Sequence, residues 1–137
     1  MPLLLFEQMC EHARRDGEHE VCGVLVGAPG EQSVGQVVVG QNVATEPAHR
    51  FMLDAATLLR ADHDARAQGS EIIGFYHSHP NQAPFPSLTD RAMMWDDVPV
   101  VIIAVRDRGL AVCGWQQRRA QLQPCLLQIE SATGEAE

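Results

Sequence analysis

Two histidines, a serine and an aspartate stand at intervals that would let their side chains serve a metal ion. They are His77, His79, Ser87 and Asp90, spaced as H-x-H-x7-S-x-x-D. Two imidazoles and one carboxylate supply three ligands, and no further Cys or His stands near them in the sequence to close a four-ligand site. A catalytic zinc ion keeps three protein ligands and leaves the fourth position to water or substrate. The spacing therefore favours one catalytic zinc per chain.

The segment before the two histidines predicts how their side chains come together. Residues 71–76 form a short apolar run with β-branched and aromatic members, which is typical of a buried strand. Residues two apart in a strand point the same way. His77 and His79, at the end of this strand, would therefore project to the same side.

The residues after the histidines predict a loop and a short helix. Three prolines enforce the loop, Ser87 stands where a helix N-cap is expected, and Asp90 follows at the third helical position. A helix over 88–95 would turn Asp90 toward the imidazoles. Each feature alone has an ordinary explanation, because Ser-x-x-Asp is a common helix start and two histidines in a strand can be polar edge residues. Their combination at one strand end favours a metal site.

These residues resemble the signature of the JAMM metalloproteases, also called the MPN-plus or Mov34 family. That signature has a distal Glu, then H-S-H-P and, after a spacer, S-x-x-D, which residues 77–80 and 87–90 match. The distal Glu should open a strand of the form E-x-C-G-x-L-x-G, and residues 20–27 match this form too. With further similarity at Arg50-Phe51 and elsewhere, the resemblance covers most of the chain, from the first helix to Trp115.

The resemblance implies a role for each matching residue. His77, His79 and Asp90 would bind zinc, and Glu20 would be the general base that takes a proton from the zinc-bound water. Ser87 would help to stabilise the developing oxyanion. These roles agree with general chemistry: zinc lowers the pKa of its bound water to about 7, a carboxylate can move the proton to the leaving amine, and a hydroxyl donor can stabilise the oxyanion.

Glu20 is the assignment that depends most on the resemblance. It lies in the acidic stretch 16–20, where a solvated carboxylate is the ordinary interpretation and Glu18 is an equal candidate on chemistry alone. The signature favours Glu20 because it stands two residues before Cys22. The family often has a proline just before this Glu, and this chain has Glu18-His19 there instead. Cys22 itself is interpreted as a buried core thiol, with any role at the site left open.

Length and composition predict one small α/β domain. A chain of 137 residues with 45% apolar side chains is large enough for one hydrophobic core. We expect residues 1–130 to form the JAMM/MPN-like domain and residues 131–137 to be a disordered tail. The late strands run consecutively, so the fold should be mixed α+β, with a curved mixed sheet flanked by helices and, as the resemblance implies, the zinc at the sheet edge. Besides the helix over 88–95 and the strand over 71–76, the patterns predict helices over 5–15 and 54–68 and strands over 21–26, within 33–44, and over 98–105, 110–116 and 122–130.

Charge and cysteine usage exclude several classes of protein. Ten basic and eighteen acidic residues give a net charge of -8, which argues against nucleic-acid binding. No segment is long and apolar enough to span a membrane, and the start of the chain lacks the pattern of a signal peptide. The four cysteines form no C-x-x-C pair and suggest no disulfide framework. We expect a cytoplasmic protein.

The resemblance also implies a substrate class. JAMM proteins cleave amide bonds next to the C-terminal Gly-Gly of ubiquitin or ubiquitin-like proteins, and compact bacterial members resemble a peptidase that releases cysteine from a sulfur carrier. This chain is short and lacks the insertions of the eukaryotic deubiquitinases, so we expect a small ubiquitin-like or sulfur-carrier protein as its partner. The partner's extended tail would add to an exposed strand edge near residues 37–43. The sequence leaves open whether the chain forms a homodimer.

Two other functional classes stay open at this point. A non-catalytic MPN-type scaffold is the first, although scaffolds of that type lose metal ligands and this chain keeps them. The second is a different zinc hydrolase, such as a nucleobase deaminase, which needs H-x-E and P-C-x-x-C. Pro124-Cys125 has no second cysteine at the required spacing. A relative associated with DNA repair is conceivable, but the acidic charge gives it no support.

Overall fold

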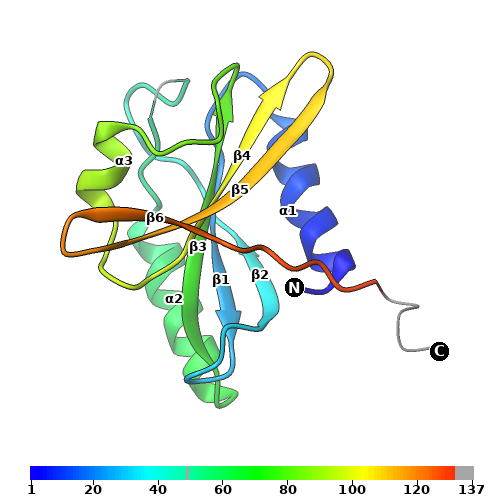
Figure 1. Ribbon diagram of the computed structural model, residues 1–137. Coiled ribbons are helices and arrows are strands. Elements are labelled where there is room, and N and C mark those ends of the chain that lie inside the picture. Colours follow the sequence, from blue (N-terminus) through cyan, green and yellow to red (C-terminus); the bar gives the residue numbers. More distant parts are fainter. Residues whose placement is uncertain (49, 132–137) are drawn as a thin grey trace.

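Six strands form one open mixed sheet in the computed structural model, which describes residues 1–48 and 50–131 (Figure 1). The strand order is β2-β1-β3-β4-β5-β6; β3 and β4 run parallel, and every other neighbouring pair is antiparallel. The elements are α1 (Leu3–Arg15), β1 (Cys22–Gly27), β2 (Val34–Val39), α2 (Ala55–Ala67), β3 (Glu71–Pro80), α3 (Leu88–Met93), β4 (Val100–Arg106), β5 (Gly109–Arg118) and β6 (Gln121–Cys125).

The two long helices cover opposite faces of the sheet. Ala13 of α1 belongs to the same buried cluster as Leu25, whereas Ala61 of α2 belongs to a second cluster with Val24. Since neighbouring residues of a strand point to opposite faces, α1 and α2 must lie on different sides of β1, as Figure 1 shows. Burial on both faces accounts for the almost uninterrupted apolar sequences of β1 and β4.

A glycine lets β1 and β3 approach where the two strands pair. Gly23 is paired with Tyr76, and a Cβ atom at residue 23 would collide with the ring of the fully buried tyrosine. The adjacent pair is Cys22 with His77, so the first residue of β1 lies beside the first histidine. This register brings the segment that ends at Glu20 next to the histidine end of β3.

The expected α/β class and mixed sheet are confirmed, and several element boundaries differ, three of which matter most for the site and for the last strand. The strand expected over 71–76 continues to Pro80, so both histidines lie within β3. The helix expected over 88–95 ends at Met93, because Met94 already has extended backbone angles. The strand expected over 122–130 was wrong beyond Cys125: the chain leaves the sheet there, and Glu130 forms only an isolated bridge with Pro2.

Other expectations concern the ends, the cysteines and membranes. Of the tail expected over 131–137, only Ser131 falls within the described residues. All four cysteines are free thiols. Within residues 1–48 and 50–131, none of the helices combines the length and the apolar character that crossing a membrane requires.

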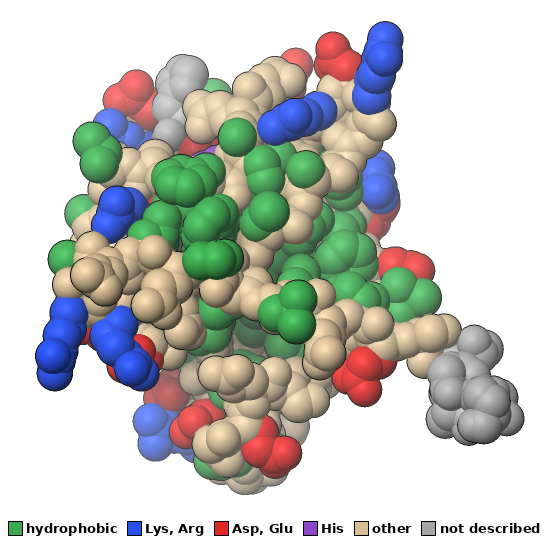
Figure 2. Space-filling view, viewed as in Figure 1, with side chains coloured by type: hydrophobic (Ala, Val, Ile, Leu, Met, Phe, Trp, Pro, Cys, Tyr) green, Lys and Arg blue, Asp and Glu red, His purple; other side chains and the backbone are tan. Residues whose placement is uncertain are grey.

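The surface gives no sign of a basic patch on the face that Figure 2 draws. Arginine side chains lie around the rim of this face, while hydrophobic side chains occupy its middle.

Candidate metal centre

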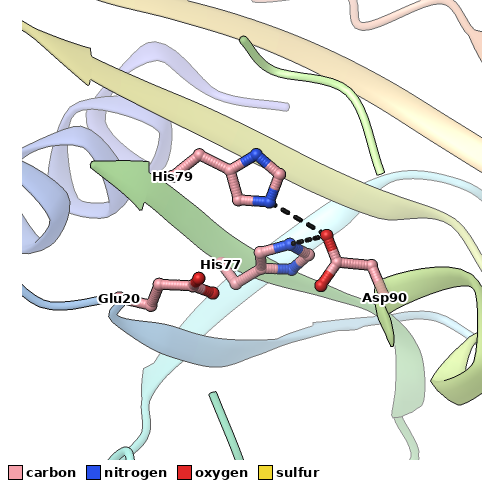
Figure 3. A group of neighbouring side chains, drawn as sticks. All are labelled: Glu20, His77, His79 and Asp90. Atoms are coloured by element: carbon pink, nitrogen blue, oxygen red, sulfur yellow. Dashed lines mark hydrogen bonds and ion pairs between the residues drawn. The ribbon is translucent and has the colours of Figure 1, made fainter. Parts of the chain in front are cut away.

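Four buried side chains converge where β3, a central strand of the sheet, ends (Figure 3). Glu20 comes from the segment before β1, His77 and His79 from β3, and Asp90 from α3. One ligand atom of each side chain lies within 4.8 Å of the ligand atoms of the other three. The structure therefore brings together four of the five residues that the sequence singled out.

The two histidines meet the same carboxylate oxygen. Their Nε2 atoms lie 3.2 Å (His77) and 2.9 Å (His79) from Oδ2 of Asp90. The Nδ1–H of His79 donates to the carbonyl oxygen of Ala83 at 2.9 Å, so a neutral His79 presents a lone pair at Nε2. The ring of His77 stacks on Phe51, with centroids 4.3 Å apart, and its Nδ1 has no hydrogen-bond partner within residues 1–48 and 50–131. Both rings are thus held by their surroundings with Nε2 toward the site.

A helix cap orients Asp90. The hydroxyl oxygen of Ser87 accepts a hydrogen bond from the Asp90 amide at 3.0 Å, and Oδ2 of Asp90 accepts one from the Ser87 amide at 3.0 Å. This capping box is the ordinary explanation of Ser-x-x-Asp, and it also aims the aspartate at the histidines. Ser87 is solvent-exposed, and its hydroxyl proton is left free to donate.

The structure separates the two candidate glutamates. Glu18 is exposed, whereas Glu20 is 4% exposed and turns its carboxylate toward the histidines, as Figure 3 shows. Among the residues that the structure describes, Oε1 of Glu20 has no hydrogen-bond partner. A buried carboxylate oxygen without a partner costs free energy, so this position points to a group that the protein atoms alone do not supply.

Burial and mutual contacts shift the pKa of every member of the cluster. Burial raises the pKa of Glu20 from 4.5 to about 7, with His79 opposing the rise and Asp90 adding to it. Burial would raise the pKa of Asp90 as well, but the hydrogen bonds with His77 and His79 outweigh it and hold this pKa well below its usual range. Burial lowers the pKa of His77, whereas the bonds to Asp90 and Ala83 outweigh burial and raise that of His79.

The donor set fits a metal cation. A carboxylate oxygen can only accept, so two imidazole nitrogens at hydrogen-bond distance from Oδ2 of Asp90 require a proton or another positive charge between the atoms. Two neutral imidazoles and a carboxylate, with a second carboxylate in reach, form the ligand set of many catalytic zinc sites. His77, His79 and Asp90 could hold the ion, and Glu20 could contact a fourth ligand.

Three residues near the site carry no metal-binding signal in the sequence. Ser78 points to the other face of β3, where its hydroxyl accepts from the Val21 amide at 2.8 Å. Phe51 stacks on His77; its place in the Arg50-Phe51 similarity was the only available hint. Asn42 lies in a loop and looks like an ordinary turn residue.

Cys22 is buried in β1, and burial together with Glu20 raises its pKa to about 12, which agrees with a core thiol.

An apolar pocket of about 230 Å³ adjoins the metal ligands between α2 and α3. His77 and Asp90 form part of its lining, and most of the remainder is apolar, including Leu58, Phe75 and Trp95. At one end of the strand order, β2 is an edge strand that pairs only with β1 among the described residues. An extended chain and an apolar side chain could therefore both be accommodated near the site.

Comparisons with known proteins gave one family match and several relatives. The family described as prokaryotic homologs of the JAB domain matches residues 3–121. A desampylase of Haloferax volcanii is 37% identical over 89 residues, which are 62% of this chain and 64% of the desampylase, slightly less than two thirds of its length. A CysO-cysteine peptidase of Mycobacterium tuberculosis is 30% identical over 104 residues, 75% of this chain and 70% of that peptidase. The solution structure of a Desulfitobacterium hafniense protein shares the fold, with a TM-score of 0.84, 23% identity and coverage of 98% of this chain and 97% of that one.

Proposed function

This chain belongs to the prokaryotic homologs of the JAB domain, and on that premise we propose that it is a zinc-dependent peptidase. Its substrate is the amide bond that follows the C-terminal Gly-Gly of a small ubiquitin-like or sulfur-carrier protein. The observation that carries the proposal is the buried convergence of Glu20, His77, His79 and Asp90. The names of the relatives, a desampylase and a CysO-cysteine peptidase, support the substrate class.

In the proposed reaction each side chain has one task. His77, His79 and Asp90 hold the ion, which when bound lowers the pKa of water and polarises the carbonyl of the scissile amide. Glu20 accepts a proton from the attacking water and gives it to the leaving amine, because its buried carboxylate lies within reach of the metal ligands. The Ser87 hydroxyl, exposed beside Asp90, donates to the oxyanion.

The substrate tail is proposed to dock as an added strand. The free edge of β2 offers backbone groups to an extended tail near residues 37–43, and the tail then runs to the metal ligands. Because two glycines next to the scissile bond present no side chains, the apolar pocket beside His77 and Asp90 is available for a neighbouring apolar residue of the substrate. Titration with a Gly-Gly-ended tail should shift the amide resonances of residues 37–43, and unchanged resonances would rule out this mode of docking.

The non-catalytic scaffold is the weaker hypothesis. A scaffold has no need of two histidines, an aspartate and a buried glutamate held within reach of one another. Burying an oxygen of Glu20 without a hydrogen-bond partner among the described residues costs free energy. A catalytic role for this carboxylate would account for that cost.

Mass spectrometry of a defined substrate tests the proposal. The zinc-loaded protein is incubated with a ubiquitin-like carrier protein whose C-terminal Gly-Gly is joined through an amide bond to cysteine or to a lysine side chain. We expect the free Gly-Gly carboxyl terminus and the released amine. An intact adduct with zinc-loaded protein, across carriers of both kinds, would leave the scaffold hypothesis as the better account.

A further inference from the structure

One loop side chain connects the proposed base to the aromatic ring behind a metal ligand. The side-chain amide of Asn42 donates from Nδ2 to the carbonyl oxygen of Glu20 at 2.7 Å and to that of Arg50 at 3.1 Å. Its Oδ1 accepts from the amides of Ala44 at 3.0 Å and Met52 at 2.9 Å. These four bonds use both N–H groups and both lone pairs of the carboxamide. They also fix its orientation, because the reversed amide would face like groups.

The backbone atoms that Asn42 binds are the ones that position the site. Arg50 and Met52 flank Phe51, so two of the four bonds hold the backbone on either side of the ring that stacks on His77. A third bond holds the carbonyl of Glu20, whose carboxylate lies in the metal cluster. Asn42 is thus bonded to the backbone of both the base and the residue behind a metal ligand.

Other contacts restrain Glu20 from the opposite side. The Val21 amide donates to the Ser78 hydroxyl at 2.8 Å, and the Ser78 amide donates to the Val21 carbonyl at 3.0 Å. The amide of Glu20 itself donates to the carbonyl of Pro47. The backbone at Glu20 is therefore held on two sides. Val21 bonds it to β3, and Asn42 bonds it to the loop. Of these contacts with Glu20, the one from Asn42 continues to the backbone on either side of Phe51, where the Val43 amide also donates to the Met52 carbonyl at 2.8 Å.

We infer that Asn42 is a positioning residue that sets Glu20 and the His77 ring relative to each other. The catalytic meaning of this inference rests on the proposed function, because it assumes that Glu20 is the base. The structural part of the inference is independent of the proposed function. Without the carboxamide, Phe51 and the His77 ring should lose their stacked arrangement whether or not the protein is a peptidase.

Asn42→Asp is the sharpest substitution. Aspartate has nearly the same shape and keeps the acceptor for Ala44 and Met52, but it places an oxygen against the carbonyls of Glu20 and Arg50. Gln41→Glu is the matched control, since it adds the same charge to the neighbouring exposed residue and leaves the carboxamide intact. Where Asn42→Asp fails to give a cooperative thermal melt, Asn42→Ser, which introduces no charge, takes its place.

The first readout is the histidine side-chain NMR spectrum of the zinc-free full chain. Phe51→Leu defines the shift of the His77 ring protons when the stacked ring is removed, and His77→Ala supplies their assignment. We expect Asn42→Asp to move these resonances in the same direction as Phe51→Leu, by at least half as much. Gln41→Glu should leave them unchanged. Wild-type shifts in Asn42→Asp, or equal changes in Gln41→Glu, would overturn the inference.

The second readout is turnover of a peptide ending in Gly-Gly-aminomethylcoumarin by the zinc-loaded proteins. A misplacement of about 1 Å costs on the order of 100-fold in rate, so we expect kcat to fall at least about tenfold in Asn42→Asp with little change in KM and in zinc content. Unchanged kcat would overturn the positioning of the base. If the wild type itself does not cleave this peptide or a carrier adduct, the proposed function fails, while the NMR result still decides whether Asn42 positions the ring.

Discussion

Buried polar side chains on the two faces of β3 differ in their hydrogen-bond partners. On the α1 face the hydroxyl of Tyr76 lies 2.7 Å from Nδ1 of His12, and the hydroxyl of Ser78 accepts from the Val21 amide at 2.8 Å. On the other face Nδ1 of His77 has no partner in the described part of the chain, and the Nε2 atoms of His77 and His79 both lie at hydrogen-bond distance from one carboxylate oxygen of Asp90. The four side chains of β3 are all nearly inaccessible to solvent, so burial alone does not explain the difference.

What differs is whether the protein alone supplies the partners. Buried polar groups in folded proteins are nearly always hydrogen-bonded, and exceptions call for an explanation. Tyr76 and Ser78 follow this rule, because the Tyr76 hydroxyl has a partner on α1 and the Ser78 hydroxyl has one in the backbone before β1. The face of His77 and His79 breaks it at two atoms, the second being Oε1 of Glu20. One strand thus carries structural polar groups on one side and, on the other, part of a buried cluster that fits a metal site.

The largest effect is expected at Glu20. Glu20→Gln keeps the shape and removes the proton acceptor, so turnover of a verified substrate should fall by about 10²–10⁴, the range of general acid–base catalysis. Zinc content should stay the same. Glu18→Gln, an exposed neighbour, is the control and should retain full activity. Full activity in Glu20→Gln would mean that the base is misassigned.

The pH dependence of stability comes next in size. The folded state raises the pKa of Glu20 to about 7, so the unfolded chain releases this proton at lower pH than the folded one. The stability that Glu20 contributes is present below pH 4.5 and is lost as the pH rises through about 7. In zinc-free protein, urea unfolding should show Glu20→Gln gaining about 2–3 kcal/mol over wild type between pH 5 and pH 8. A constant difference would contradict the raised pKa.

On the α1 face, Ser78→Ala should affect stability and not the metal. The Val21 amide would be buried without its hydroxyl partner, which costs about 1–3 kcal/mol of the free energy of unfolding. Zinc content should remain at the wild-type value. Ser33→Ala, at an exposed serine, is the control and should cost little. Loss of zinc in a folded Ser78→Ala protein would contradict the claim that polar groups on the α1 face serve stability and not metal binding.

The smallest effect is expected at Tyr76. Tyr76→Phe removes one hydroxyl and leaves His12, which is only half-buried, free to bond with water. The free energy of unfolding should fall by about 1 kcal/mol or less, measured by urea denaturation, with zinc binding unchanged. A loss as large as that in Ser78→Ala would mean that the His12 contact matters more than its exposure suggests.

The sequence predicted the parts of this molecule that local patterns encode. The apolar strands and the β3 histidines on one face follow from residue periodicity, and the capping box was visible in Ser87-x-x-Asp90. The last strand was extended too far, because the apolar residues beyond Cys125 continue a strand-like sequence while the chain itself turns away from the sheet. Periodicity does not indicate whether a neighbouring strand is available.

The tertiary contacts of the site were beyond local patterns. Glu18 and Glu20 are equivalent in the sequence by chemistry, and only the pairing of Cys22 with His77 makes one of them buried beside the histidines. Phe51 stacks on His77 and Asn42 bonds to Glu20, and each of these two contacts joins residues more than twenty positions apart, which no short window contains. For Glu20, resemblance to a family supplied what the residues alone could not.

The most direct test of the central claim is metal stoichiometry. Wild type, His77→Ala and His63→Ala, which alters an exposed histidine of α2, are reconstituted with zinc, desalted and measured by elemental analysis. The account predicts one zinc per chain in wild type and in His63→Ala and none in His77→Ala. No zinc in the wild type, or zinc retained in His77→Ala, would contradict the assignment of this cluster as a metal centre.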